Sequence, residues 1–310
     1  MDWRYDSPSM TAFADRLLEA IRAKGTPTMV GLDPRLDHLP EPFRSQAQGS
    51  ASDAATALRD FHRELLATIA PMIPVVKPQA AFFERLGHAG VAALEDAVAT
   101  AKELGMLVVM DAKRGDIGST ATAYADAWLG GGHGQCLPAS DALTVNPYLG
   151  EDACSPFLEA ADQHDAGLFL LVKTSNPGAG LFQDHGEPPL ADQVAEAVAG
   201  WGASRIGACG WSSIGAVVGA TRPSELAHFR RLMPHTLLLL PGFGFQGGTA
   251  EGLAPAFDDK GEGAVINASR SILHAHERED LAGLPDWQSR TAAAVEEMRE
   301  QLSSIMPATS

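Results

Sequence analysis

The segment LVVMDAKRGDIGSTATAY, residues 107–124, decides the fold because it joins an apolar run to a dense group of charges. The apolar run predicts a strand that is buried on both faces. Four charged side chains follow at once: Asp111, Lys113, Arg114 and Asp116. Asp116 falls beyond the strand, in a connection or in the first turn of the next helix. The segment therefore predicts a strand–helix unit with a charged group at the carboxyl end of its strand.

Other apolar segments repeat this arrangement along the chain, mostly without the alternation of a half-exposed strand. The predicted strands are 28–33, 74–78, 107–113, 142–146, 167–174, 213–220, 236–242 and 263–269. Eight strands that alternate with helical patterns predict an α/β fold, the (β/α)8 TIM barrel. A doubly wound sheet is the alternative.

Amphipathic stretches lie between these strands. In residues 52–70, apolar side chains such as Leu58 and Phe61 recur at helical spacing, and Ser52 is the predicted N-cap. Further helices are predicted at 11–24, 89–104, 190–201 and 286–304. The first and last of these lie outside the barrel units. Residues 1–310 are therefore predicted to form a single barrel domain with extra N- and C-terminal helices.

Three long polar segments interrupt the pattern, at 34–51, 129–141 and 177–190. The last belongs to the Gly/Pro-rich stretch SNPGAGLFQDHGEPP, which follows the fifth strand and is predicted to serve as a lid. The other two segments receive no predicted role.

Composition excludes some classes of partner. The 310 residues carry a net charge of -16, which argues against nucleic acid or an anionic membrane as a partner. Three widely spaced cysteines, Cys136, Cys154 and Cys209, form no disulfide framework, and the polar N-terminus does not resemble a signal peptide. No apolar run is long enough to span a membrane. A cytoplasmic protein is therefore expected.

Polar residues stand at the carboxyl ends of nearly all the predicted strands. In (β/α)8 barrels these ends meet at one rim, where active sites form. The residues are Asp33, Lys77, Asp111, Lys113, Asp116, Asn146, Lys173, Thr174, Ser175, Asn176, Asn267, Ser269 and Arg270. A helix cap or a turn explains any one of them alone, but their convergence predicts a polar binding site.

The seventh and eighth strands carry a phosphate-binding pattern. PGFGFQGG offers backbone N–H groups without obstructing side chains, and Arg270 offers a planar fork of donors. A turn that simply needs glycine explains the same stretch without a ligand. Gly242, Gly244 and Gly247 also satisfy GxGxxG, but they lie in the seventh unit and Glu262 precedes the next strand. A dinucleotide site is therefore disfavoured.

Two places in the sequence carry side chains of the kind that bind metals. Asp111 and Asp116 could hold Mg²⁺, but Lys113 between them would supply the neutralising charge instead. His274 and His276 form HxH without a third ligand nearby in sequence, so they are predicted to be exposed helix histidines. No metal site is therefore predicted.

The Asp-x-Lys-x-x-Asp pattern has a specific chemistry. Asp111 and Lys113 are two residues apart, so on an extended strand they face the same side. A lysine among carboxylates stays charged, which suits it to stabilise and protonate a carbanion. An aspartate that faces a substrate carboxylate repels it until that group leaves as CO₂. The pattern fits a decarboxylation, and a purely structural ion-pair cluster is the alternative.

DAKRGDIGSTA, residues 111–121, resembles the signature of the orotidine 5'-phosphate decarboxylase family, in its longer, type 2 bacterial branch. Further family-like motifs follow in order: GLDP (31–34), VVKPQAAFFE (75–84), TVNPYLGED (144–152), KTSNPGAG (173–180), LPGFGFQGG (240–248) and NASRSI (267–272). Because they span most of the chain, the set is far more specific than Asp-x-Lys-x-x-Asp alone.

The resemblance implies an enzyme without cofactor or metal that makes UMP from orotidine 5'-phosphate, the last step of de novo pyrimidine nucleotide synthesis. Lys113 matches the lysine that protonates C6, and Asp111 matches the carboxylate beside the substrate carboxylate. The implied substrate contacts are Asp33 and Lys77 to the ribose, Ser175 to the pyrimidine, and Gln246, Gly244 and Arg270 to the phosphate.

The resemblance also implies a homodimer with shared active sites. Asp116 matches an aspartate that reaches into the neighbouring subunit's site, and Thr120 matches a residue that accompanies it. Two alternatives remain at this stage. One is a metal-dependent sugar-phosphate decarboxylase or aldolase of the same barrel group, and the other is a non-catalytic nucleotide-binding barrel.

Overall fold

The computed structural model describes residues 12–304, except 136–137, 220–221 and 243–249. Eight parallel strands pair in sequence order, and β1 pairs with β8 to close the barrel. The strands are β1 (Thr28–Leu32), β2 (Val75–Pro78), β3 (Leu107–Arg114), β4 (Ala142–Val145), β5 (Gly167–Lys173), β6 (Ser212–Val218), β7 (Thr236–Pro241) and β8 (Ala264–Ala268). The predicted (β/α)8 barrel is confirmed, and closure rules out the doubly wound sheet.

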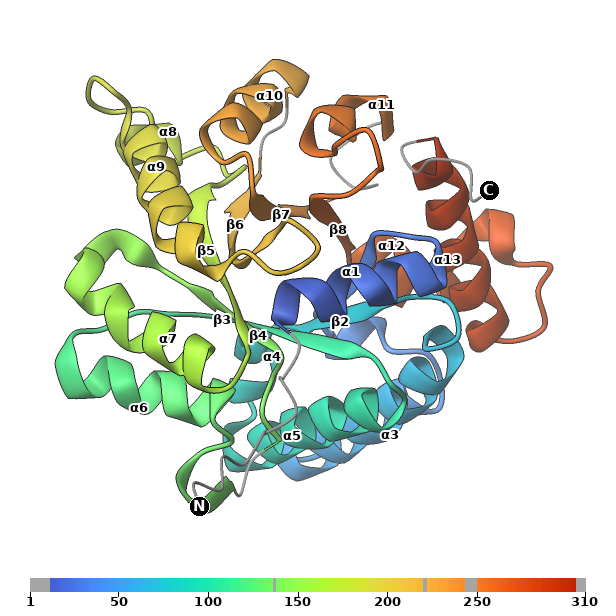
Figure 1. Ribbon diagram of the computed structural model, residues 1–310. Helices are drawn as coiled ribbons and strands as arrows, with labels where there is room; N and C mark the ends of the chain where they lie inside the picture. Colours follow the sequence, from blue (N-terminus) through green and yellow to red (C-terminus); the bar gives the residue numbers. More distant parts are fainter. Residues whose placement is uncertain (1–11, 136–137, 220–221, 243–249, 305–310) are drawn as a thin grey trace, which may run out of the picture.

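Helices surround the barrel, as Figure 1 shows. They are α1 (Phe13–Lys24), α2 (Phe43–Gln46), α3 (Ala51–Ile69), α4 (Ala80–Glu84), α5 (Gly87–Glu103), α6 (Gly118–Leu129), α7 (Glu151–Gln163), α8 (Gly180–Gln183), α9 (Leu190–Gly202), α10 (Pro223–Leu232), α11 (Ala250–Leu253), α12 (Arg270–Leu273) and α13 (Trp287–Ser303). The predicted terminal helices correspond to α1 and α13. The segments after β1 and β5 contain the short helices α2 and α8.

Successive strand residues face two different cores, which explains why the strands are apolar throughout. On β2, Val75 packs inside the barrel, whereas Val76 packs outward against the helices. On β3, Val109 and Met110 divide in the same way. The inward positions one step further toward the carboxyl ends are polar, and they form the site described below.

Helix α1 closes the amino-terminal end of the barrel. Phe13 packs edge-on against Phe169 of β5, with ring centroids 6.1 Å apart. A Cβ atom at Gly167 would lie only 2.2 Å from Phe13 Cδ1, so glycine makes room for this ring. In Figure 1 the helix crosses in front of the strands. The opposite, carboxyl end of the barrel is the end that carries the charged residues.

The start of α3 corrects a prediction. The N-cap is Ser50, not Ser52: the Ser50 side chain accepts from the backbone N–H of Asp53, and the Asp53 side chain accepts from that of Ser50. This reciprocal capping box satisfies two backbone donors that the first helical turn leaves unpaired. Ser52 instead lies inside the first turn of the helix.

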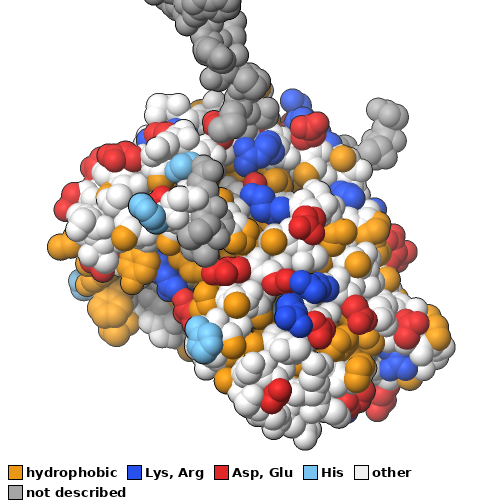
Figure 2. Space-filling model, turned by 90° about the horizontal axis from the view of Figure 1, so that it is seen from below, with side chains coloured by type: hydrophobic (Ala, Val, Ile, Leu, Met, Phe, Trp, Pro, Cys, Tyr) orange, Lys and Arg blue, Asp and Glu red, His pale blue; other side chains and the backbone are white. Residues whose placement is uncertain are grey.

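The surface carries both signs of charge. On the face drawn in Figure 2, lysine and arginine side chains are scattered among acidic ones instead of forming one basic patch. Among the described helices, none is long and apolar enough to cross a membrane.

Candidate active site

Four charged side chains form a row across the carboxyl end of the barrel, and we call them the charge ladder: Asp33, Lys77, Asp111 and Lys113. Lys77 Nζ lies 4.0 Å from Asp33 Oδ1 and 2.8 Å from Asp111 Oδ2. Lys113 Nζ lies 2.5 Å from Asp111 Oδ1. Adjacent members therefore have opposite charges, and both oxygens of Asp111 are bound by lysines.

The middle of the ladder is buried, and the opposite charges of its members fix its charge state. Burial alone would raise the pKa of Asp111, but Lys77 and Lys113 outweigh it and lower that pKa to about 2. Burial alone would lower the pKa of Lys77, yet Asp111 and Asp33 raise it. Asp111 is consequently ionised and Lys77 protonated at neutral pH.

Two neutral side chains complete the surroundings of Asp111. Gln79 Nε2 donates to Asp111 Oδ2 at 2.9 Å, and Thr144 Oγ1 donates to Asp111 Oδ1 at 3.0 Å. The backbone N–H of Lys113 donates to Thr144 Oγ1 at 2.9 Å. Sequence reasoning missed both residues. Strand alternation could have identified Thr144, because it lies two positions after the inward residue Ala142 on β4.

Lys113 reaches Asp111 by a different route from the predicted one. The prediction assumed a regular strand, but the pairing of β3 with β4 shifts register between Met110 and Arg114. Lys113 has φ 47°, in the left-handed region that favours glycine. The two side chains do meet, as predicted, but an irregular backbone at the end of β3 brings them together.

The ladder borders a cavity of about 270 Å³. Lys77, Asp111 and Lys113 line it on one side. Other strand ends contribute Leu171, Thr174, Ser175, Asn176, Val217, Leu239 and Pro241. A ligand here would therefore meet charges on one side and largely apolar surface on the other. Ser175 is among the lining residues, and its predicted contact with the pyrimidine stays a prediction.

Asp116 and Thr120 lie away from this cavity. Asp116 Oδ1 accepts from the backbone N–H of Ile117 at 2.8 Å, and Thr120 is exposed on α6. Neither is among the residues that line the cavity in the described part of the chain. The adjoining Ile117 is 59% exposed, which leaves a large apolar side chain on the surface beside Asp116.

The predicted phosphate contacts are only partly described. Arg270 is exposed and begins α12, directly after β8. Gly244 and Gln246 lie outside the described residues, so their predicted roles stay predictions. Asp33 Oδ1 is a buried acceptor without a hydrogen-bond partner among the described residues, which suits it to accept from a ligand hydroxyl.

The segment after β5 is tied back to the end of its strand. Lys173 forms an ion pair with Asp184 and lies 3.8 Å from Glu225. Gln183 Oε1 accepts from the backbone N–H of Thr174 at 3.0 Å, and its Nε2 donates to Thr174 Oγ1 at 2.8 Å. The predicted lid therefore has its middle anchored close to its root.

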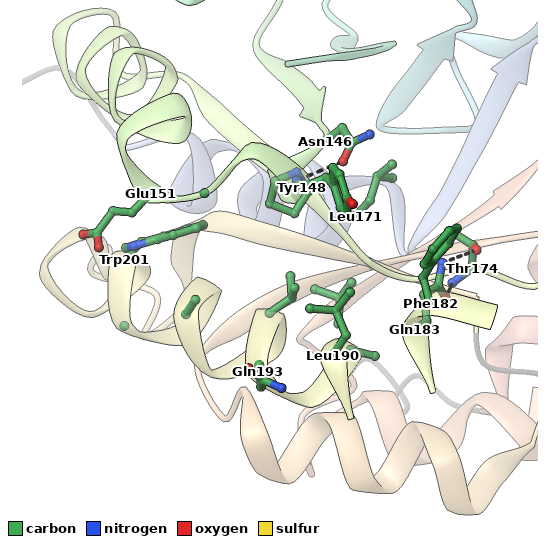
Figure 3. A pocket seen from close by; sticks show the side chains of 17 residues that line it. Asn146, Tyr148, Glu151, Leu171, Thr174, Phe182, Gln183, Leu190, Gln193 and Trp201 are labelled. Carbon is green, nitrogen blue, oxygen red and sulfur yellow. Dashed lines mark hydrogen bonds between the residues drawn. The ribbon is translucent and has the colours of Figure 1, made fainter. Parts of the chain in front are cut away.

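A second hollow, of about 700 Å³, lies beside the charged cavity and shares Leu171 and Thr174 with it. Figure 3 shows Tyr148, Leu190 and Trp201 among its lining residues, together with Phe182 and Gln183, which belong to α8. Its lining is mostly apolar and contains one charged residue, Glu151. Its size exceeds that of the first cavity, but the groups able to move protons lie in the first.

The prediction for the HxH pair was wrong. His274 and His276 are half-buried, and His38 and Glu277 lie beside His274 in the folded chain.

The chain is similar to known proteins of one family. A family model described as "Orotidine 5'-phosphate decarboxylase / HUMPS family" matches residues 29–282. An orotidine 5'-phosphate decarboxylase of Rhodopirellula baltica is 48% identical over 94% of this chain and 99% of its own length. One from Deinococcus radiodurans is 43% identical over 95% and 98%. The structure of Leishmania donovani OMP decarboxylase matches with a TM-score of 0.74 and 32% identity, covering 96% of this chain and 100% of that one.

Proposed function

The chain belongs to the orotidine 5'-phosphate decarboxylase / HUMPS family, and on that premise we propose that it converts orotidine 5'-phosphate to UMP and CO₂, with Lys113 as the proton donor. The activity is that of a carbon–carbon lyase in pyrimidine nucleotide synthesis. The observation that carries the residue roles is the pairing of Asp111 with Lys113 beside a cavity that also contains Ser175.

The charge ladder suits a reaction in which negative charge moves. A substrate carboxylate placed about 4 Å from Asp111 is repelled by roughly 4 kcal/mol at an effective dielectric constant near 20. When the bond to CO₂ breaks, its electron pair stays on C6 of the pyrimidine. Lys113 stabilises that carbanion and transfers a proton to C6, which gives UMP, and solvent then returns a proton to the amine.

The network around Asp111 holds this arrangement before substrate binds. Lys77, Gln79 and Thr144 all donate to Asp111, so the carboxylate cannot rotate without losing hydrogen bonds. A fixed dipole array of this kind requires little reorganisation when charge develops on the substrate. Gln79 and Thr144 therefore act as positioning residues in this proposal.

Binding groups lie around the reacting centre. Ser175 contacts the pyrimidine, and Asp33 and Lys77 contact the ribose hydroxyls. Asp33 Oδ1 accepts no hydrogen bond from the described residues, and this free acceptor supports the ribose contact. Arg270, with Gly244 and Gln246, binds the phosphate. Because the phosphate is remote from C6, its binding energy can serve to close the lid over the substrate.

We also propose a homodimer in which each site borrows a residue from its neighbour. Asp116 and Thr120 do not line the cavity of their own chain, as expected if they serve the partner's site. Exposed Ile117 supplies apolar surface for such contact. In this arrangement Asp116 of the partner subunit stands near Lys113 and supplies its second carboxylate.

Two alternative functions predict different results in an activity assay. A metal-dependent sugar-phosphate enzyme of the same barrel group would need Mg²⁺, and a non-catalytic barrel would bind UMP without turnover. The relatives that match this chain over nearly their whole length at 48% and 43% identity bear the decarboxylase name, which favours the first proposal.

The decisive assay mixes the purified protein with orotidine 5'-phosphate in EDTA and follows the ultraviolet absorbance. A rapid change with UMP as product is the expected result. Activity that appears only when Mg²⁺ replaces EDTA would instead indicate the sugar-phosphate class. Tight UMP binding without any absorbance change in either buffer would contradict the proposed reaction.

A further inference from the structure

A cluster of metal-ligating side chains lies outside the charge ladder. It consists of His38, His274 and Glu277, and one ligand atom from each lies within 4.8 Å of the others. His38 ends the short 3-10 helix η1 (Leu36–His38), in a segment that the sequence left without a role. His274 follows α12, and Glu277 ends η6 (Ala275–Glu277). The fold thus joins the connections that follow β1 and β8.

Within the cluster, two atoms able to bind a metal face each other: His38 Nδ1 and a carboxylate oxygen of Glu277. His38 Nδ1 lies 2.9 Å from Glu277 Oε1 and 3.0 Å from Oε2. The rings of His38 and His274 are stacked, with centroids 4.6 Å apart and planes at 10°. We propose that His38, His274 and Glu277 form a binding site for one divalent transition-metal ion of the Zn²⁺ class, with the remaining coordination position left to water.

The donor set suits that ion. Two histidines and one glutamate are a common zinc-binding combination, with ligand bonds of about 2.0–2.2 Å. Tetrahedral bonds of that length place ligand atoms roughly 3.4 Å apart. The widest separation in the cluster, at most 4.8 Å, therefore has to shorten by no more than about 1.4 Å. Rotation of the His274 ring out of the stack can supply this movement, because that residue is only half-buried.

Neighbouring groups prepare the histidines for coordination. Asp37 Oδ2 lies 3.5 Å from His38 Nε2, on the side of the ring opposite Glu277. With a metal on Nδ1, the Nε2–H group would face this carboxylate, the usual support of a metal-bound histidine.

The ion would fix the spacing of two substrate contacts. His38 follows Asp33 on the same connection, and His274 lies one helical turn after Arg270. An ion that ties His38 to His274 therefore holds the proposed ribose and phosphate contacts at one separation. Its loss is expected to raise KM and leave kcat nearly unchanged, and this expectation alone rests on the proposed function.

Binding is tested without substrate, on untagged full-length protein stripped with EDTA and dialysed. Titration with Zn²⁺ in a calorimeter should show one ion per chain, and Co²⁺ should give the visible absorption of a four-coordinate site. His274→Ala and Glu277→Gln should each weaken binding at least tenfold. His88→Ala, at an exposed position on α5, is the matched control and should bind as the wild type does.

Thermal unfolding supplies a second readout. Saturating Zn²⁺ should raise the midpoint of the wild type and of His88→Ala but not that of His274→Ala. Equal binding by the wild type and His274→Ala would overturn the proposal, as would the lack of stoichiometric binding at micromolar Zn²⁺. Either result leaves the EDTA assay for decarboxylation untouched, so the two proposals fail independently.

Discussion

Lys113 Nζ lies 2.5 Å from Asp111 Oδ1, while the backbone of Lys113 itself adopts the left-handed conformation at φ 47°. A non-glycine residue held in that region costs on the order of 1–3 kcal/mol. The register shift at the end of β3 thus accompanies a strained residue whose side chain serves the site. The position favours glycine for stability and lysine for chemistry.

Replacing Lys113 should separate these two effects. Lys113→Ala and Lys113→Gly should both lower kcat by at least about 10³-fold, since each removes the general acid. Lys113→Gly should nevertheless have a free energy of unfolding roughly 1 kcal/mol higher than that of Lys113→Ala, because glycine adopts positive φ without strain. Absorbance assays and urea unfolding measure the two quantities. Equal stability of the two variants would show that the strain is absent.

Removing the hydroxyl of Thr144 should misplace Asp111 without removing a charge. Thr144→Val loses the bond to Asp111 and the acceptor for the Lys113 backbone N–H. We expect kcat to fall roughly 10- to 100-fold, with KM changed much less, because the loss is felt mainly as charge develops. Thr144→Ser keeps the hydroxyl and is the control. A serine variant as slow as the valine variant would argue against the hydrogen-bond role.

Mixing two inactive variants should restore activity if sites are shared between subunits. Lys113→Ala and Asp116→Ala should each be nearly inactive alone. A mixed dimer contains one site with both residues intact, so random exchange should regain about a quarter of the wild-type activity. Native mass spectrometry reports whether subunits have exchanged. Confirmed exchange without regained turnover would refute the shared site.

Arg270→Ala should discriminate between phosphorylated and unphosphorylated ligands. The guanidinium is proposed to bind the phosphate, so UMP binding should weaken by roughly 2–3 kcal/mol while uridine binding stays within about twofold. Calorimetric titration with both ligands gives the comparison, with exposed Arg231→Ala as the control. An equal loss for UMP and uridine would place Arg270 elsewhere in the site.

Acid should destabilise the protein through His62. This residue is buried between Phe61 and Phe83, and its Nδ1 lies 2.6 Å from the Leu58 carbonyl oxygen. Burial lowers its folded-state pKa from 6.5 to about 4. Below pH 6.5 the unfolded chain therefore binds a proton that the folded chain refuses, so stability falls as the pH drops toward 4.

The size of this effect is measurable against a variant. Because of His62, the free energy of unfolding should be about 2 kcal/mol lower at pH 5 than at pH 7.5. His62→Leu should lack that part of the pH dependence, whatever its stability at pH 7.5. Urea unfolding of both proteins at the two pH values gives the difference. Parallel pH profiles would show that His62 does not resist protonation.

The barrel could be predicted because its signal is local. A strand buried on both faces must be apolar along its length, so β5 was predicted at 167–174 and observed as Gly167–Lys173. The rim residues Lys77, Asp111 and Lys113 followed from the same rule, because they stand where the apolar runs end. In the structure these three residues and Ser175 line one cavity, while their roles toward a substrate stay predictions.

What escaped prediction depends on geometry between distant parts of the chain. His38 and Glu277 are 239 residues apart, and nothing in either local sequence indicates the other. The left-handed Lys113 arises from a register shift that only the pairing with β4 defines. The N-cap is different, because Ser50 and Asp53 form a capping-box pattern that is visible in the local sequence.

Helix α1 has a consequence for the order in which the chain folds. Its Asp15 accepts from the Cys209 backbone N–H, and Arg22 pairs with Glu262, contacts that span 194 and 240 residues. During synthesis this helix leaves the ribosome early, long before those partners exist. Helix α1 can therefore close the amino-terminal end of the barrel only late, after most of the strands have been synthesised. Contacts of such high sequence separation slow folding, so a helix that emerges before its partners is among the last to dock.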